Sequence, residues 1–421
     1  MAMKIALISD THLGFKWGTP RFDDAFEQAR EAFEKALQKG AELILVGGDI
    51  FEKAIPSLEV LTRTLEILNL RLNHESTVKF AGGKKPEPQA LRGTPIVALH
   101  GNHEWRSRGQ TNVLEALEKA GVLIYLNFEN IVFETSIGKV AIHGMSYVPE
   151  RYAAEALKHW NPTPVKGAIN ILLLHQSLGS FVFEDREQAR IQLGDLPEGF
   201  DLYVCGHVHC RGETQVRGVP LLFPGSTERT QLLEAEKIKG FYLVDFSDGG
   251  KIRYEFIELE TPRDFFFEEL SFREVELAEL EKSIENKIEE ILKRPRKNSK
   301  PPLIKLKLTG TLAKGIMSSD FDSQRIIEEF AGKAILEIDR TRLLSSVAAE
   351  KAELVRKLRE QPMSLRDKTI RLIEEYLAEL VREPLFNILE LYQLLTEEKE
   401  EVIEKRVEEI IAARVRAEVE S

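Results

Sequence analysis

The chain has 421 residues, which is too many for one ordinary hydrophobic core and therefore predicts two or three domains. A hydrophobic content of 43% is normal for a globular protein in water, and the longest apolar runs, such as residues 169–174, are far too short to cross a bilayer. The first residues, Met-Ala-Met-Lys, lead into an apolar stretch without the pattern of a signal peptide. We therefore expect a cytoplasmic protein, or a nuclear one in a eukaryote.

The formal net charge of −11 argues on average against a nucleic-acid partner, but it hides one local cluster of cations. Residues 293–307, called the basic segment below, contain no acid. The segment is either a solvated loop or a surface for phosphate groups. Its cations are Lys293, Arg294, Arg296, Lys297, Lys300, Lys305 and Lys307.

Only two cysteines are present, Cys205 and Cys210, and so few exclude a disulfide framework. Both flank the segment Gly-His-Val-His, which leaves zinc ligation open. The simpler interpretation is a small buried residue and a loop thiol.

The first part of the chain, residues 4–125, alternates strands and helices. Glycines, prolines and polar residues make residues 74–92 a predicted loop. Strands are predicted at 5–8, 43–46, 96–99 and 124–126, and helices at 23–39, 57–72 and 112–119.

The next part, residues 131–260, is dominated by strands. Strands are predicted at 131–135, 139–143, 169–174, 202–205, 219–223, 240–246 and 252–259, with one helix at 151–159. Together with residues 4–125, this pattern predicts an α/β fold in which two sheets pack face to face and helices cover the outside.

The rest of the chain changes character twice. Residues 264–340 show a mixed pattern, with helices at 274–292 and 323–329 and strands at 303–308 and 333–338. From about residue 345 the pattern is helical, and its apolar stripes exceed what short helices can bury among themselves. We expect a partner surface to cover them, although a small self-contained bundle is the alternative. The predicted domains are 1–262, 263–343 and 344–421.

Acidic, amide and imidazole side chains recur where the predicted apolar strands end. Each could be a capping or core residue by itself, but five strand ends of this kind indicate a metal centre at one edge of a sheet. The residues are Asp10, His12, Asp49, Asn102, His103, His175, His207 and His209.

This mixture of ligand types suits manganese, iron or zinc better than a site for magnesium alone. The number of ligands exceeds what one ion needs, so we expect two ions bridged by Asp49, the only acid placed between the other motifs. Two such ions can clamp a phosphate and activate water at neutral pH. His103 is free to bind the phosphate or to protonate the leaving oxygen, and Glu104 could orient it.

The five motifs together resemble the calcineurin-like metallophosphoesterase superfamily over residues 4–230. Three features are similar more narrowly to DNA-repair nucleases of the meiotic-recombination-eleven (Mre/SbcD) type. These are Ile-Ser-Asp-Thr-His-Leu-Gly at 8–14 followed by a Phe-Asp-x-Ala-Phe helix start, Asp-Ile-Phe at 49–51 leading into Ile-Pro-Ser, and Gly-Ser-Thr-Glu-Arg at 225–229.

The resemblance implies one ion on Asp10, His12, Asp49 and His209, another on Asp49, Asn102, His175 and His207, and His103 as the catalytic histidine. It implies an α/β/β/α sandwich and two Mn ions, with Fe, Zn or Mg as alternatives. The implied activity is that of a 3′-to-5′ exonuclease and single-strand endonuclease.

The same resemblance implies partners. The protein would be a homodimer that binds DNA and a Rad/SbcC-type coiled-coil ATPase, and no membrane. Residues 263–343 would cap the DNA, the basic segment would contact its phosphates, notably through Lys293, Arg294, Arg296, Lys297 and Lys300, and the C-terminal helices would bind the ATPase.

Two positions depart from the family pattern, namely Glu52, where many relatives carry His or Asp, and Glu104, where Asp is usual. Neither removes a predicted ligand, but both bear on the balance of exonuclease and endonuclease activity. A phosphodiesterase of small molecules and an inactive scaffold subunit are the competing interpretations. The residues beyond the phosphoesterase part argue against the first, because a small substrate needs neither a cap with a basic loop nor unburied helices. The complete set of ligands argues against the second.

Overall fold

The computed structural model describes residues 2–349 except 108, 183–189, 232–237 and 248–251. Beyond residue 349 it describes only 351, 356, 370, 373, 392, 403–405, 407–409 and 411–412, all of which are helical. The amphipathic faces predicted for the C-terminal region therefore lie mostly outside the described residues. Within the part that is described, none of the helices combines the length and the apolar character needed to span a bilayer.

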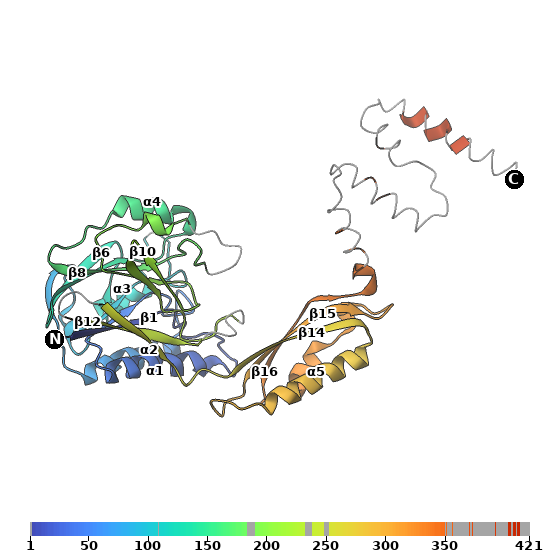
Figure 1. Cartoon of the computed structure of the whole chain (residues 1–421), viewed down its shortest axis with the longest axis horizontal. Coiled ribbons are helices and arrows are strands. Elements are labelled where there is room, and N and C mark those ends of the chain that lie inside the picture. Colours follow the sequence, from blue (N-terminus) through green and yellow to red (C-terminus); the bar gives the residue numbers. More distant parts are fainter. Residues whose placement is uncertain are drawn as a thin grey trace. The chain divides into compact units, whose positions relative to one another are not determined.

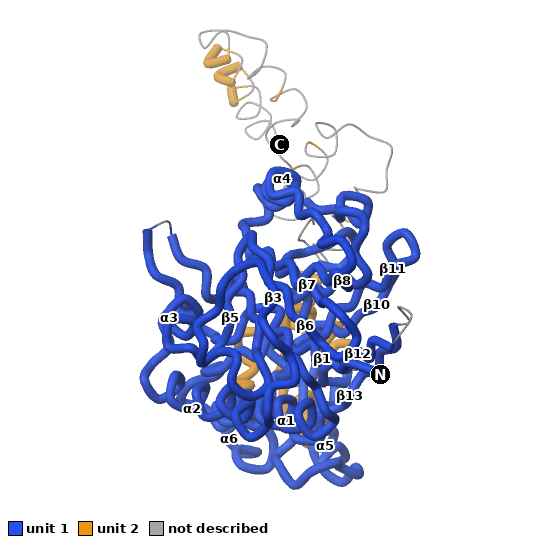
Figure 2. Tube along the Cα trace, turned by 90° about the vertical axis from the view of Figure 1, so that its left-hand side faces the viewer, with its two compact units in different colours: residues 1–268, 286–306, 327–337 blue, residues 269–285, 307–326, 338–421 orange. Residues whose placement is uncertain are grey.

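The chain divides into two compact units, shown in two colours in Figure 2. The first contains residues 1–268, 286–306 and 327–337, and the second contains 269–285, 307–326 and 338–421. Every predicted metal-site residue belongs to the first unit. The predicted domain boundaries after residues 262 and 343 stay predictions.

The first unit contains a six-stranded sheet whose central strands are parallel. β1, β2, β4 and β5 run in the same direction, and β12 and β13 add antiparallel strands at one edge. The order is β13 (Ile252–Glu258), β12 (Gly240–Ser247), β1 (Ala2–Ile8), β2 (Leu43–Val46), β4 (Ile96–Ala98) and β5 (Ile124–Tyr125).

A second sheet of seven strands also has a parallel centre, formed by β7, β8, β9 and β11. The order is β10 (Gly212–Val216), β11 (Val219–Phe223), β9 (Leu202–Gly206), β8 (Ala168–His175), β7 (Gly138–Met145), β6 (Glu129–Thr135) and β3 (Lys79–Gly83). Parallel strands at the centre of both sheets bring several strand ends to the same edge.

Side chains alternate between two hydrophobic layers along the central strands, as the period of two requires. In β1, Ile5 and Leu7 pack between the two sheets, whereas Ala6 and Ile8 pack on the helical side. In β8, Leu173 faces the layer between the sheets and Leu174 faces a third layer. The predicted α/β/β/α sandwich is thus confirmed.

Helices cover the two outer faces. Figure 1 shows α1 (Phe22–Gln38) and α2 (Leu58–Leu68) on one side of the sheets and α4 (Glu150–Trp160) on the other. α3 (Val113–Lys119) also packs in the layer on the side of α1. Ser57 and Asn112 cap α2 and α3 by accepting backbone N–H bonds, so two of the predicted helix starts have a local chemical cause.

Three strands of the structure were not predicted from the sequence pattern. β3 lies inside the predicted 74–92 loop, and β10 was not predicted either; both are edge strands with polar or glycine-rich sequences. β14 (Phe265–Val275) alternates between half-buried and exposed side chains and was also missed. The helix predicted to continue to residue 72 ends at Leu68 and is followed by a 3₁₀ turn, Asn69–Asn73.

Apart from the missed β14, the remaining elements fit the mixture of helices and strands predicted for 264–340. β14, β15 (Leu303–Leu312) and β16 (Ile335–Leu344) form a three-stranded sheet. The helices are α5 (Leu277–Leu292) and α6 (Ser323–Glu329). Short 3₁₀ turns lie at Pro88–Leu91, Leu193–Asp195 and Ser318–Asp320.

Candidate metal centre

The predicted ligands follow strands from both sheets. Asp10 and His12 come directly after β1, Asp49 follows β2, His175 ends β8, and His207 and His209 follow β9. The loops after β1 and β2 are joined by backbone bonds, because the N–H of Asp10 donates to the carbonyl of Gly48 and that of His12 to the carbonyl of Asp49, both at 3.0 Å. The two loops therefore act as one scaffold for the side chains they carry.

Four of these residues have left-handed backbones. The φ angles are +51° at Asp10, +45° at His12, +49° at Asp49 and +78° at His207. Such conformations cost free energy in residues other than glycine and are concentrated at functional sites. Here they follow buried strands and turn short polar side chains toward a common centre.

A first group of side chains consists of Asp10, His12, Asp49 and His209, whose potential ligand atoms lie within 4.8 Å of one another. The Nε2 atoms of His12 and His209 are 3.0 Å apart, and His209 Nε2 is 3.7 Å from Asp10 Oδ1. Two nitrogens that bind one cation at about 2.1 Å and at a right angle lie about 3.0 Å apart. The spacing therefore suits a shared cation.

A second group consists of Asp49, His175 and His207, also within 4.8 Å. His175 Nε2 is 3.3 Å from Asp49 Oδ2 and 3.3 Å from Asn102 Oδ1, and His207 Nδ1 is 3.0 Å from the same Asn102 oxygen. All seven predicted ligands are thus brought together in two groups, and Asp49 belongs to both.

Contacts at the other ring nitrogens orient three of the histidines. Nδ1 of His12 is 2.9 Å from Glu52 Oε2, Nδ1 of His209 is 2.6 Å from Thr230 Oγ1, and Nδ1 of His175 is 2.6 Å from the Gly47 carbonyl. A proton on Nδ1 in each ring leaves the Nε2 lone pair directed at the centre, which is the usual arrangement behind metal-binding histidines. The sequence did not predict these roles for Glu52 and Thr230.

The chemistry of Asp49 fits a cation as well. Its Oδ2 atom is buried and lacks a well-aligned hydrogen bond, with His175 Nε2 3.3 Å away, and such an oxygen is costly unless a positive charge neutralises it. Burial raises the pKa of Asp49, but His175 and His12 outweigh it and hold the pKa well below its usual range. Burial lowers the pKa of His175, but Asp49 more than offsets this and raises it to about 9. Positive charge is therefore favoured beside Asp49.

His103 differs from the buried histidines around it. Its side chain is 28% exposed, its backbone N–H donates to Asp49 Oδ1 at 2.9 Å, and its Nδ1 is 2.8 Å from the carbonyl of Glu52. A proton donated from Nδ1 leaves Nε2 for a substrate. The ring packs edge-on against His12, with centroids 4.7 Å apart, so His103 is held at the open side of the centre.

Glu104 does not orient the His103 ring, contrary to expectation. Its buried carboxylate instead accepts three backbone N–H bonds, from Asp49 at 3.1 Å, Phe51 at 2.7 Å and Gly101 at 2.7 Å. The side chain therefore ties the loop after β4 to the loop after β2. It shapes the backbone that carries Asp49 rather than the ring of His103.

Replacing Glu104 with alanine is expected to lower the free energy of unfolding by about 3–5 kcal/mol, because three buried N–H groups lose their acceptor. Urea unfolding of the metal-free protein measures the change. Glu155→Ala, at an exposed position of α4, is the matched control and should cost less than about 0.5 kcal/mol. Equal stabilities for the two variants would contradict the role of Glu104.

The remaining candidates lie apart from these groups. Cys205 is buried, its thiol donates to the carbonyl of Gln176, and neither cysteine belongs to a cluster with metal-ligand spacing among the described residues.

In the basic segment, Arg294 forms ion pairs with Glu268 at 2.7 Å and Glu290 at 2.8 Å. Lys297 pairs with Glu258, and Lys300 with Glu27 and Asp24.

Comparison with known proteins bears on both the fold and the site. Residues 3–211 match the calcineurin-like phosphoesterase family. The chain is 30% identical to the DNA double-strand break repair protein Mre11 of Methanopyrus kandleri over 64% of its length and 60% of the relative's. It is 28% identical to the double-strand break repair protein MRE11 of Encephalitozoon cuniculi, over 70% of this chain and 54% of that one.

A third relative is covered more fully. The chain is 26% identical to the DNA double-strand break repair protein Mre11 of Archaeoglobus fulgidus, over 82% of this chain and 75% of the relative. The chain spans less than two thirds of the length of the Methanopyrus kandleri and Encephalitozoon cuniculi relatives. The predicted resemblance to repair proteins of this type is confirmed. The phosphoesterase match at residues 3–211 includes the residues of the candidate metal centre.

Proposed function

Because residues 3–211 belong to the calcineurin-like phosphoesterase family, we propose that this protein is a metal-dependent nuclease that hydrolyses DNA phosphodiesters in double-strand break repair. The observation that supports this most is the pair of ligand groups that share Asp49. The named repair proteins among its relatives favour DNA as the substrate.

In this proposal Asp10, His12, Asp49 and His209 hold one cation, and Asp49, Asn102, His175 and His207 hold the other. Bound divalent cations polarise a phosphodiester and lower the pKa of water. Manganese is the proposed metal, with iron, zinc and magnesium as alternatives, because the donors mix carboxylate, amide and imidazole. Glu52 and Thr230 keep the protons of His12 and His209 on Nδ1.

His103 is the proposed catalytic histidine. The carbonyl of Glu52 accepts from Nδ1–H, so in the doubly protonated ring the Nε2 proton is available for the leaving oxygen or for a hydrogen bond to the phosphate. Its partial exposure, beside histidine ligands that are almost completely buried, makes it the histidine that a substrate reaches first.

We further propose that the protein removes nucleotides in the 3′-to-5′ direction and cuts single strands, as a homodimer that works with a Rad/SbcC-type ATPase. The predicted apolar stripes of residues 344–421 would bind that ATPase. Residues 263–343 would cap the DNA.

The deciding experiment is a nuclease assay on end-labelled linear duplex and on circular single-stranded DNA. It uses Mn²⁺, Mg²⁺, Fe²⁺ or Zn²⁺ after chelation, with and without the coiled-coil ATPase. We expect metal-dependent cleavage of both substrates, greatest with Mn²⁺. Turnover of a cyclic mononucleotide but not of DNA would instead favour a phosphodiesterase of small molecules, and no turnover with any metal would favour a scaffold.

The basic segment is proposed to contact DNA, and the structure sharpens which cations to test. Arg294, Lys297 and Lys300 form ion pairs with acids of this chain, whereas Lys293 and Arg296 are exposed without an ion pair among the described residues. A cation that is already paired with a carboxylate contributes less binding free energy when it contacts a phosphate. Lys293 and Arg296 are therefore the better candidates.

The double variant Lys293→Ala/Arg296→Ala is expected to weaken DNA binding. The slope of log K against log[salt] should also become less negative by about 2, because each phosphate contact contributes about −0.9 to that slope. Titration of a labelled duplex at several salt concentrations measures the slope. Arg151→Ala/Lys158→Ala, which removes an exposed arginine and lysine from α4, is the matched control. Identical slopes for both double variants would show that the segment is only a solvated loop.

A further inference from the structure

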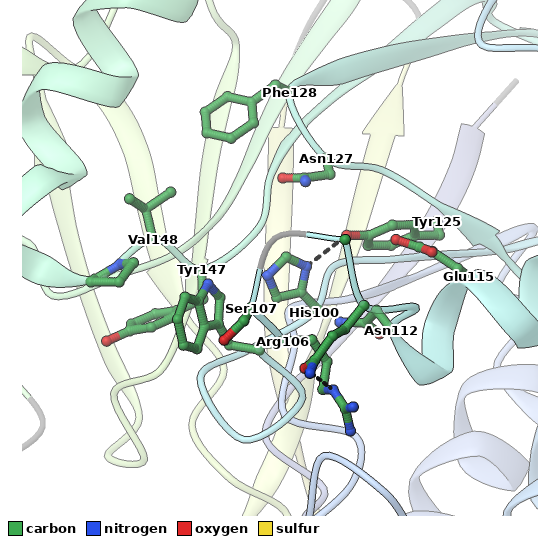
Figure 3. Close-up of a pocket in the computed structure, with 14 residues that line it drawn as sticks. His100, Arg106, Ser107, Asn112, Glu115, Tyr125, Asn127, Phe128, Tyr147 and Val148 are labelled. Atoms are coloured by element: carbon green, nitrogen blue, oxygen red, sulfur yellow. Dashed lines mark hydrogen bonds between the residues drawn. The ribbon is translucent and has the colours of Figure 1, made fainter.

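Figure 3 shows the residues that line a cavity of about 310 Å³. One of them, Tyr147, also neighbours two side chains of the candidate metal centre. The walls of the cavity include four aromatic side chains, Trp105, Tyr125, Phe128 and Tyr147, together with uncharged polar ones such as His100 and Asn127. One arginine, Arg106, and one glutamate, Glu115, balance each other in charge. A site of this composition suits a flat, uncharged, polar ligand rather than a second phosphate group.

Tyr147 belongs to both the cavity and the surroundings of the metal centre. The centroid of its ring is 6.2 Å from that of His175 and 5.9 Å from that of His207. Its backbone N–H donates to the carbonyl of His100 at 3.0 Å, and His100 precedes Asn102 by only two residues. A ligand that contacts Tyr147 in the cavity would therefore lie close to two of the proposed metal ligands, His175 and His207.

The polar groups of the cavity include an acceptor that the protein leaves unused. Asn127 Oδ1 is buried and has no hydrogen-bond partner, whereas Nδ1 of the nearby His100 ring is 2.7 Å from the hydroxyl of Tyr125 (Figure 3). Buried amide oxygens without a donor are rare in folded proteins because they cost free energy. A donor group of a bound ligand would remove that cost.

Trp105 supplies a surface for stacking. It follows His103 by two residues, lines the cavity, and is 43% exposed, although indole rings are usually well buried. Exposed aromatic side chains next to a nuclease centre are typical platforms for unpaired bases. In this chain the platform is built into the loop that carries Asn102 and His103.

We propose that this cavity binds the nucleobase of the nucleotide next to the cleaved phosphodiester, stacked on Trp105 and hydrogen-bonded to Asn127. The inference rests on the proposed nuclease function. Because Asn127 Oδ1 accepts a hydrogen bond, it favours a base that presents a donor on its free edge, either an exocyclic amino group or a ring N–H, over an analogue that lacks one. Cleavage thereby requires a base that is separated from its partner strand.

The test uses short single-stranded oligonucleotides in which one phosphodiester remains and methylphosphonates replace the others, so that the cut position is known. An abasic nucleotide stands on the 5′ side of that bond, on the 3′ side, or on neither. For the unmodified protein, removal of the base on one side is expected to lower kcat/KM about 5- to 100-fold, the range of base–aromatic stacking. Trp105→Ala should abolish most of this difference, and Tyr152→Ala, an exposed aromatic of α4, should keep it.

A second comparison examines Asn127. The unmodified protein should prefer cytosine to 2-pyrimidinone, the analogue without the amino donor, at the sensitive position by about 3- to 10-fold, the value of one hydrogen bond, and Asn127→Ala should equalise the two. Equal cleavage with and without a base on both sides, while DNA is still cut, would overturn the inference and leave the proposed function standing. Failure to cut any of the oligonucleotides or natural DNA would overturn both.

Discussion

Replacing Asp49 with asparagine is expected to abolish DNA cleavage and to reduce the bound metal to less than one equivalent per chain. Both ligand groups contain Asp49, so one substitution removes a negative charge from two proposed cation sites at once. Losing several kcal/mol of electrostatic stabilisation in the transition state corresponds to a fall in kcat of about 1,000-fold or more. Metal analysis and single-turnover cleavage of an end-labelled duplex measure the two effects.

The matched control for this variant is Asp201→Asn. Asp201 accepts a hydrogen bond from the backbone of Asn170 at 2.7 Å, and it precedes β9 at the end opposite to His207. The same chemical change is thus made at the edge of the sheet opposite to the candidate metal centre. The metal content of this variant should stay at two equivalents per chain. If Asp49→Asn also kept two equivalents, the assignment of a shared carboxylate would be wrong.

Replacing His103 with glutamine is expected to lower kcat about 100- to 10,000-fold, the range for loss of a general acid, while both metals stay bound. The ring lies at the open side of the centre, and it is the backbone of His103 that hydrogen-bonds to Asp49. Glutamine keeps that backbone bond but cannot donate a proton to a leaving oxygen. His159→Gln, an exposed position in α4, serves as the control and should leave kcat unchanged.

A change of leaving group separates the two roles that His103 can have. If His103 protonates the leaving oxygen, the defect of His103→Gln should shrink greatly with a p-nitrophenyl ester of thymidine monophosphate, because nitrophenolate leaves without a proton. If His103 binds the phosphate instead, the defect should be equal for both substrates. Full activity of the variant on DNA would exclude either role.

The polar residues of the candidate centre were predictable because of where they stand in the sequence. Asp10, Asp49 and His175 each follow or end an apolar run that reads as a buried strand, and the carboxyl ends of parallel strands share one edge. Local sequence is sufficient here because burial on both faces leaves a continuous apolar pattern.

The residues that orient the ligands were not predictable in the same way. Glu52 and Thr230 stand in loops without any pattern of their own, and Glu104 looked like a partner for its neighbour His103. The structure shows that Glu104 accepts bonds from the backbones of residues 49, 51 and 101 instead. Such roles depend on which loops meet in space, and no spacing along the chain encodes them.

By itself, therefore, the sequence determined the fold class, the position of most strands and helices, and the set of acidic, amide and imidazole side chains at the strand ends. Only the tertiary structure decided that His12 meets His209 across 197 residues of chain, which nitrogen of each ring points inward, and that a cavity with an unused amide oxygen borders the same centre. The reason is physical: hydrophobic periodicity is a local property of the chain, whereas contacts between distant loops follow from how the two sheets pack against each other.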